Sequence, residues 1–249
     1  MNKFYNKTQL GFAIFWIVIY IVLASVGDSI SALLKVEKSI TSIVLLIMGI
    51  ILLIWIIRNK YAEKFGLCMP KYKAKYYLYY IPLLIMISIN LWLGVNLNYT
   101  VLETILYIVS MICVGFLEEI VFRGLLFTAM AKDNLVVAII VSSITFGIGH
   151  IINLFTGGGV GIVANICQVF YAMAAGFLFV IIFYRGGSLI PCIITHGLFN
   201  ALSCFMNYSI LTPTIDIIMS IILIVLNIGY ALILLKIFPK NIEITQKHS

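Results

Sequence analysis

Residues 40–57 read ITSIVLLIMGIILLIWII, a run of apolar and small side chains without a single charge. A helix needs about 20 residues of this kind to cross the hydrocarbon core of a bilayer. Seven further apolar stretches occupy residues 10–26, 77–93, 101–130, 135–155, 161–184, 188–206 and 214–238. They lack the alternation of apolar and polar residues that marks a membrane barrel. We therefore expect an all-α polytopic membrane protein with about eight transmembrane helices.

The composition of the whole chain predicts the same fold class. Of the 249 residues, 63% are hydrophobic and only 10% are charged, whereas soluble domains carry about 25% charged residues. Lipid must therefore be the solvent for most of the exterior. We expect residues 1–249 to form a single transmembrane domain. Because the fourth stretch is too long for one straight span, we expect its last turns to lie within the protein or at the interface.

Lysine and arginine are distributed unevenly between the stretches, and this predicts the orientation of the chain. Short cytoplasmic loops carry an excess of both residues. With eight spans and a cytoplasmic N-terminus, the outer loops hold only Lys35 and Lys38, and Arg123 lies within a span. The inner segments hold the other thirteen: Lys3, Lys7, Arg58, Lys60, Lys64, Lys71, Lys73, Lys75, Lys132, Arg185, Lys236, Lys240 and Lys247. We expect a multi-pass protein of the cell membrane with both termini in the cytoplasm.

The net charge of +7 therefore indicates topology and not a nucleic-acid partner. Lys3 and Lys7 before the first apolar stretch resemble the start of a signal peptide. Residues 24–26, Ala-Ser-Val, make a poor cleavage site, so we expect this span to be retained.

Ionisable and amide side chains in the middle of the spans are the candidate functional residues. A charged side chain at the bilayer centre costs about 2.5–3.5 kcal/mol on insertion scales, so such residues are expected to be few, inward-facing and paired. Three of the apolar stretches carry them: Glu118, Glu119 and Arg123 in the fourth, His150 in the fifth, and His196 and Asn200 in the seventh. We expect these three helices to bring the six side chains together in a buried polar site.

Helical spacing places the two glutamates on different faces of one helix. Glu119 and Arg123 are four residues apart, so they share a helix face and can form an ion pair. Glu118 points about 100° away on a helix with 3.6 residues per turn and can face a different cavity. His196 and Asn200 also share a face, and Phe146 can wall the ring of His150 four residues later.

Each residue also has a structural interpretation. The Glu119–Arg123 pair could simply fix helix packing, a lone His150 could bind a neighbouring carbonyl, and Asn200 could hold two helices together. A carboxylate, two imidazoles and an amide on three helices, however, supply a general base, a polarising group or ligand, and a donor for an oxyanion. The combination therefore favours catalysis.

Three motifs carry a resemblance to a known family. Residues 118–123 read EEIVFR, which fits EExxxR; residues 146–150 read FGIGH, which fits FxxxH; residues 196–200 read HGLFN, which fits HxxxN. Together with RGGSLIP at 185–191, this order resembles the CAAX protease and bacteriocin-processing family (CPBP or Abi) over about residues 101–206. The resemblance implies an eight-helix intramembrane endopeptidase that acts on a peptide or membrane-protein substrate at the bilayer.

The resemblance also implies a role for each motif residue. Glu118 would activate the attacking water with help from His150, and His196 and Asn200 would stabilise the tetrahedral oxyanion. Glu119 and Arg123 would hold the helix and tune Glu118.

The sequence leaves the question of a metal open. Glu118, His150 and His196 make a credible set of three zinc ligands with a free position for water. The two histidines are, however, 46 residues apart, and no HExxH motif is present. We slightly favour a water activated by glutamate without a metal.

Three classes of function remain to be weighed. A chain rich in Ile, Asn and Lys is typical of an AT-rich bacterial genome, which favours a bacteriocin or pheromone precursor, or self-immunity, over prenylated CAAX proteins. A non-catalytic immunity or interaction protein of the same fold has no use for a costly Glu118. A proton-coupled transporter is expected to show paired repeats or broken helices, and none is evident in the sequence.

Two further features concern the access of water. Asn165 and Gln168 could line a wet cavity or form hydrogen bonds between helices, and the sequence does not favour either. The run Gly157-Gly158-Gly159 is expected to form a tight turn and, as the alternative, a gate.

Overall fold

The computed structural model describes residues 1–154 and 161–238. The predicted turn at Gly157-Gly158-Gly159 lies outside the described residues. Within them the regular structure is helical, apart from an isolated antiparallel bridge between Val95 and Met206. This confirms the all-α polytopic membrane fold.

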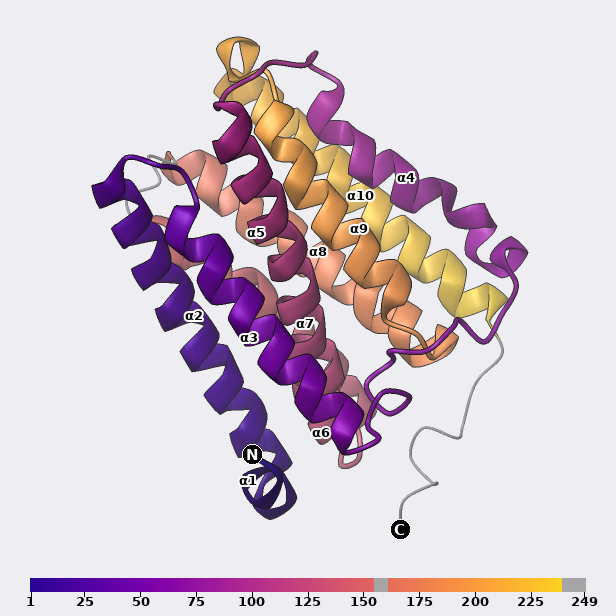
Figure 1. Cartoon of the computed structure of the whole chain (residues 1–249). Coiled ribbons are helices and arrows are strands. Elements are labelled where there is room, and N and C mark those ends of the chain that lie inside the picture. The colour runs from indigo at the N-terminus through magenta and orange to yellow at the C-terminus, as the bar shows by residue number, and fades with distance from the viewer. Residues whose placement is uncertain (155–160, 239–249) are drawn as a thin grey trace.

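The chain forms a bundle of long helices joined by short helical turns (Figure 1). The α-helices are α1 (Asn2–Lys7), α2 (Gln9–Leu34), α3 (Ser39–Arg58), α4 (Ile81–Ser88), α5 (Val101–Glu119), α6 (Thr128–Met130), α7 (Leu135–Gly149), α8 (Ile162–Gly186), α9 (Ile190–Leu202) and α10 (Pro213–Ile237). The tighter or wider helical segments are η1 (Ala74–Tyr80), η2 (Ile89–Leu91), η3 (Ile120–Phe127), η4 (His150–Leu154), η5 (Ser203–Phe205) and η6 (Tyr208–Ile210).

Seven helices within the described ranges are long and apolar enough to cross a membrane. They are Gln9–Leu34, Ser39–Arg58, Ala74–Leu91, Val101–Met130, Leu135–Leu154, Ile162–Gly186 and Pro213–Ile237. The eighth expected span is a shorter apolar helix, Ile190–Phe205. It starts with Pro191 in its first turn and ends where Met206 becomes extended. Its neighbours α5 and α4 pack along it, and Ile194 and Leu198 form an exposed apolar face.

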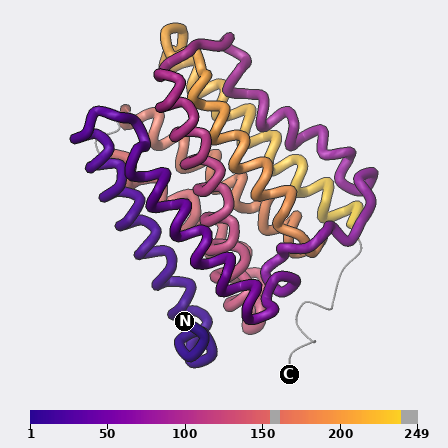
Figure 2. The backbone as a smooth tube through the Cα atoms, viewed as in Figure 1, coloured from indigo at the N-terminus to yellow at the C-terminus, as the bar shows by residue number. Residues whose placement is uncertain are grey.

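The loops gather at two ends of the bundle. Figure 2 shows the α2–α3 loop, the segment before α5 and the segment after α9 at one end, which we call the upper end. The segment after α3, the α6–α7 connection and the α8–α9 turn lie at the opposite end, together with α1. Within the described residues, the Lys- and Arg-rich segments at these places, all predicted to be cytoplasmic, therefore share the lower end.

The third span starts irregularly. Leu78, Tyr79 and Tyr80 all have positive φ angles, and only from Ile81 does the chain follow a regular α-helix. Such angles are strained for residues with a Cβ. The kink is anchored by Tyr77, whose ring is fully buried and whose carbonyl accepts a hydrogen bond of 2.7 Å from Tyr230 Oη.

The long fourth stretch continues from α5 into a π-helix, η3, in which all eight residues are buried. The prediction that its last turns lie inside the protein is thus confirmed. A π-helix pairs residues five apart, and such segments occur frequently at functional sites. Two hydroxyl groups donate hydrogen bonds to backbone carbonyls of this segment. Ser142 Oγ donates to Phe122 O at 2.9 Å, and Thr128 Oγ1 donates to Arg123 O at 3.1 Å.

Two glycines allow the helices around the polar residues to touch. A Cβ on Gly115 of α5 would lie 2.5 Å from the backbone nitrogen of Gly197 in α9. A Cβ on Gly147 of α7 would lie 2.7 Å from the carbonyl oxygen of Val169 in α8. Small residues at helix contacts permit this kind of close backbone approach in membranes. The contacts bring Glu118 and Glu119 next to His196, and His150 next to α8.

Candidate active site

The position of the two glutamates follows from the way α5 begins. Thr100 and Glu103 form a capping box, in which the Thr100 side chain accepts from Glu103 N and the Glu103 side chain accepts from Thr100 N. This arrangement satisfies two backbone donors that would otherwise lack partners. It fixes the first turn of α5, and Glu118 and Glu119 follow at its last turn.

Glu119 lies on the packed side of α5. Its Oε1 atom is 3.1 Å from Arg123 Nη1 and 2.9 Å from His196 Nδ1, and neither Glu119 nor Arg123 is exposed. The guanidinium carbon of Arg123 lies 4.1 Å from the centre of the Phe146 ring. The predicted i, i+4 ion pair is therefore present, and it extends to the imidazole of His196.

Glu118 points to the other side, toward a cavity. Its Oε1 atom accepts a hydrogen bond of 2.5 Å from the hydroxyl of Tyr20 on α2. Its Oε2 atom lies 3.6 Å from His196 Nε2 and has no hydrogen-bond partner among the described residues. One carboxylate oxygen is thus held, and the other is buried beside His196 without a hydrogen-bond partner among the described residues.

His150 is fixed by two neighbours. Its Nδ1 atom lies 3.2 Å from Phe146 O, and its backbone carbonyl accepts a hydrogen bond of 2.8 Å from Asn165 Nδ2. Because a carbonyl oxygen can only accept, Nδ1 must carry the proton in this contact, which leaves Nε2 of a neutral ring as an acceptor. The ring of Phe146 packs edge-on against His150 with 5.4 Å between centroids, as expected.

His196 stands between the two glutamates. With Nδ1–H donated to Glu119, the ring is oriented so that Nε2 faces Glu118. In the neutral ring Nε2 is an acceptor, whereas in the protonated ring both nitrogens donate. A ring protonated between two carboxylates is the form that can donate to an oxyanion.

The cavity has a volume of about 500 Å³, within the range of about 300–1,000 Å³ found for small-molecule sites. Tyr107, Met111, Val114 and Glu118 line it at spacings of three and four residues, which is one face of α5. At 1.5 Å per residue this stripe runs about 16 Å from Glu118 toward the upper end. His150 and Asn200 line the same cavity.

Gln168 lines the cavity and accepts a hydrogen bond of 3.0 Å from Asn153 Nδ2. Asn165 is instead buried and holds the carbonyl of His150. Of the two residues predicted to line a wet cavity or join helices, Gln168 therefore does both and Asn165 does the second.

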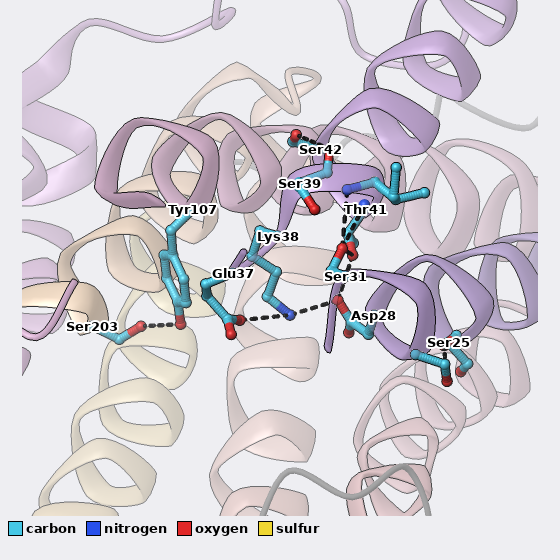
Figure 3. A network of polar contacts seen from close by, with 12 residues as sticks. Ser25, Asp28, Ser31, Glu37, Lys38, Ser39, Thr41, Ser42, Tyr107 and Ser203 are labelled. Carbon is cyan, nitrogen blue, oxygen red and sulfur yellow. Dashed lines mark hydrogen bonds and ion pairs between the residues drawn. The ribbon is translucent and has the colours of Figure 1, made fainter. Parts of the chain in front are cut away.

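Figure 3 shows a network of polar contacts at the upper end, in which Asp28, Lys38, Thr41, Tyr107 and Ser203 line the cavity. Lys38 Nζ lies 2.8 Å from Asp28 Oδ1, which also accepts from Thr41 Oγ1 at 2.6 Å. Tyr107 and Ser203 share a hydrogen bond of 3.0 Å. Tyr208, beside them, has a pKa raised to about 12, first by burial and then by Tyr107. It therefore remains a neutral phenol at physiological pH.

A bound metal ion would need several His, Cys, Asp or Glu side chains close together. Among the described residues, no group of three or more His, Cys, Asp and Glu side chains could hold one. His150 Nδ1 faces its own helix carbonyl, and His196 Nδ1 is taken up by Glu119. Each ring thus keeps Nε2 as the nitrogen that could bind a metal, and a zinc ion held by Glu118, His150 and His196 stays the alternative that the sequence left open.

The structure links Glu118, Glu119, Arg123 and His196 by direct contacts, and His150 and Asn200 line the same cavity as Glu118. Sequence reasoning missed Tyr20, because a single tyrosine in an apolar span carries no motif and no helical partner of its own. It also missed that His196 contacts both glutamates. Only the order of the helices in space could have shown either contact.

These features define a helical membrane protein with a cluster of acidic, basic and imidazole side chains buried between its helices. Comparison with protein families then identifies the region. Residues 100–202 match the family described as Type II CAAX prenyl endopeptidase Rce1-like, in agreement with the resemblance that the three motifs carry. No curated protein and no solved structure matches the chain. Tyr20 lies outside the matched residues.

Proposed function

We propose that this protein is an intramembrane endopeptidase in which Glu118, assisted by His150, activates a water molecule. Its substrate is a small or membrane-associated peptide, of the kind that includes bacteriocin and pheromone precursors. The family match supports a peptidase of the CAAX type. The observation that carries the mechanism is the Glu118 carboxylate, which lines the cavity with one oxygen held and the other unpaired.

The reaction follows from these contacts. Water between Glu118 and the peptide carbonyl gives a proton to Oε2 as its oxygen bonds to the carbonyl carbon. His196, protonated, and Asn200 donate to the resulting oxyanion. Glu118 then passes the proton to the leaving nitrogen as the carbon–nitrogen bond breaks. General acid–base catalysis by a positioned side chain of this kind contributes about 10²–10⁴-fold.

Glu119 and Arg123 serve this reaction indirectly. Both are fully buried and neither lines the cavity. Glu119 orients His196 through Nδ1, and Arg123 compensates the buried charge of Glu119. Their role is to hold the imidazole in place.

We further propose that both termini are cytoplasmic and that the protein lies in the cell membrane. The uneven distribution of Lys and Arg supports this orientation. In this orientation the polar end of the cavity, with Lys38 and Asp28, faces away from the cytoplasm.

The main test uses Glu118→Ala, His150→Ala and His196→Ala beside Glu63→Ala, which removes an exposed acid from the loop after α3. Each variant is purified and incubated with short quenched-fluorescent peptides, with and without a prenylated cysteine, and cleavage is confirmed by mass spectrometry. We expect cleavage by the wild type and Glu63→Ala and none by the other three. If folded alanine variants cleave as the wild type does, the peptidase proposal is wrong.

A second experiment addresses the metal. The protein is treated with a chelator until elemental analysis finds no zinc, and cleavage is measured again. We expect the rate to be unchanged. A loss of activity that zinc restores would instead show that the three residues act as ligands.

A further inference from the structure

We propose that Tyr20 is a positioning residue for Glu118, so that the first long helix contributes to the active site. Its hydroxyl holds one oxygen of the carboxylate and thereby keeps the other beside His196. This inference rests on the proposed function, because it assigns Tyr20 a task in the reaction of Glu118.

The contact between Tyr20 and Glu118 is short and buried. The phenol oxygen donates to Oε1 at 2.5 Å, and the two residues lie 98 positions apart in the chain. Tyr20 is 8% exposed and Glu118 is 9% exposed. Hydrogen bonds to an ionised acceptor are shorter and about twice as strong as neutral ones, so this single bond can fix the carboxylate.

A fixed carboxylate matters because glutamate is flexible. Its terminal torsion is broad and roughly two-fold, and its side chain loses considerable entropy when it is held. A tyrosine side chain has only two χ angles, so its hydroxyl is a rigid hydrogen-bond donor. With Oε1 held by Tyr20, Oε2 is left beside His196 Nε2, where the water must bind.

The packing and the cavity around Tyr20 support this role. Helix α2 packs against α3 and against η3, the π-helix that directly follows Glu119. Tyr20 lines the same cavity as Glu118, His150 and Asn200. Residues 100–202 provide the motif residues, and Tyr20 is an additional contribution from outside that region.

A purely structural interpretation must be tested against this proposal. A buried tyrosine hydroxyl usually finds a partner whatever its function, and Glu118 could be that partner by chance. In that case loss of the hydroxyl would change stability but not the turnover of bound substrate.

The test compares Tyr20→Phe with Tyr230→Phe. Tyr230 is also buried, but its hydroxyl donates to the carbonyl of Tyr77 and it does not line the cavity. Both changes remove one hydroxyl and keep the ring. With the short quenched-fluorescent peptides as substrates, we expect Tyr20→Phe to lower kcat about tenfold with KM nearly unchanged, since a hydrogen bond to a charged group is stronger than a neutral one. Tyr230→Phe should leave kcat within about twofold of the wild type.

A second measurement does not depend on peptidase activity. Dicyclohexylcarbodiimide, a membrane-permeant reagent for buried carboxyl groups, is added to each variant, and the modification of Glu118 is followed by mass spectrometry. We expect Glu118 to react several times faster in Tyr20→Phe, because Oε1 has lost its partner, and at the wild-type rate in Tyr230→Phe.

The outcomes separate this inference from the proposed function. Equal labelling in both variants shows that the contact is not made and overturns the inference. Faster labelling with unchanged kcat shows a merely structural bond and also overturns it. If Glu118→Ala keeps full cleavage, the proposed function itself fails, and the labelling rates still report whether Tyr20 holds Glu118.

Discussion

Two sides of one helix end differ sharply although they start from the same residue type. On the cavity side, Glu118 has one oxygen bound by Tyr20 and one unpaired oxygen beside His196. On the packed side, Glu119 is fully buried against Arg123 and His196. Adjacent carboxylates on a helix diverge by about 100°, and this rotation alone gives them different surroundings.

The difference teaches how chemistry and stability are divided in this site. A buried charge that is fully paired resists change, because removal of its partner leaves an uncompensated ion. A partly held carboxylate at a cavity can bind water and exchange a proton. His196 joins the two sides, since one ring nitrogen contacts each glutamate.

The largest effect is expected when the charge of Glu118, on the cavity side, is removed. Glu118→Gln keeps the size of the side chain and removes the base. We expect cleavage to fall by about 10²–10⁴-fold, with a free energy of unfolding equal to that of the wild type or higher. The measurements are peptide cleavage and unfolding in detergent. A large loss of stability with Glu118→Gln would show that both glutamates are structural.

The next effect concerns the packed side. Arg123→Met keeps an unbranched side chain of similar length but leaves Glu119 buried beside His196 without its cation. We expect the free energy of unfolding to fall by about 3–5 kcal/mol, measured by chemical unfolding. The double variant Arg123→Met with Glu119→Gln should recover part of this loss, because the buried charge is gone. No recovery would mean that Arg123 acts through its aromatic contact with Phe146 and not through the ion pair.

The close contact of α5 with α9 provides a smaller, graded test. In Gly115→Ala the added Cβ meets the backbone of Gly197, and overpacking of this kind costs about 1–3 kcal/mol. We expect lower stability together with lower activity, because Glu118 and His196 are pushed apart. The control is Gly229→Ala in α10, where nothing lies within 4 Å of the new atom. If the two alanine variants behave alike, this contact does not set the geometry of the site.

The smallest expected effect lies at His150. Asn165→Val removes the donor to the carbonyl of His150, which we expect to loosen the ring and to lower kcat about threefold to tenfold, since a neutral hydrogen bond contributes about 0.5–1.5 kcal/mol. The control Asn227→Leu removes a buried amide in α10 that has no partner within the described part of the chain. It should leave activity unchanged and stability unchanged or higher.

Much of the fold could be predicted because lipid imposes a simple rule. Runs such as residues 40–57 can only be spans, and the charges at their ends predict how they are oriented. Motif spacing also predicted the ion pair of Glu119 with Arg123 and the divergence of Glu118, since both are local properties of a helix.

What the sequence could not show depends on contacts between helices or on backbone irregularity. Tyr20 reaches Glu118 across 98 positions, and no local pattern reports such a distance. The positive φ angles at Leu78 to Tyr80 depend on the burial of Tyr77. The short eighth helix likewise depends on the neighbours that pack along it.

The π-helical segment η3 has a consequence for how the chain tolerates changes in length. A wide turn holds more residues for the same rise than an α-helical turn, so one residue can be lost between Gly124 and Phe127 if the segment tightens into ordinary α-helical turns. Glu118, Glu119 and Arg123 lie before that point and would keep their facing. The same loss between His196 and Asn200 would rotate the amide by about 100° away from the imidazole. The segment η3 can therefore accommodate the loss of one residue, whereas α9 cannot lose one between His196 and Asn200.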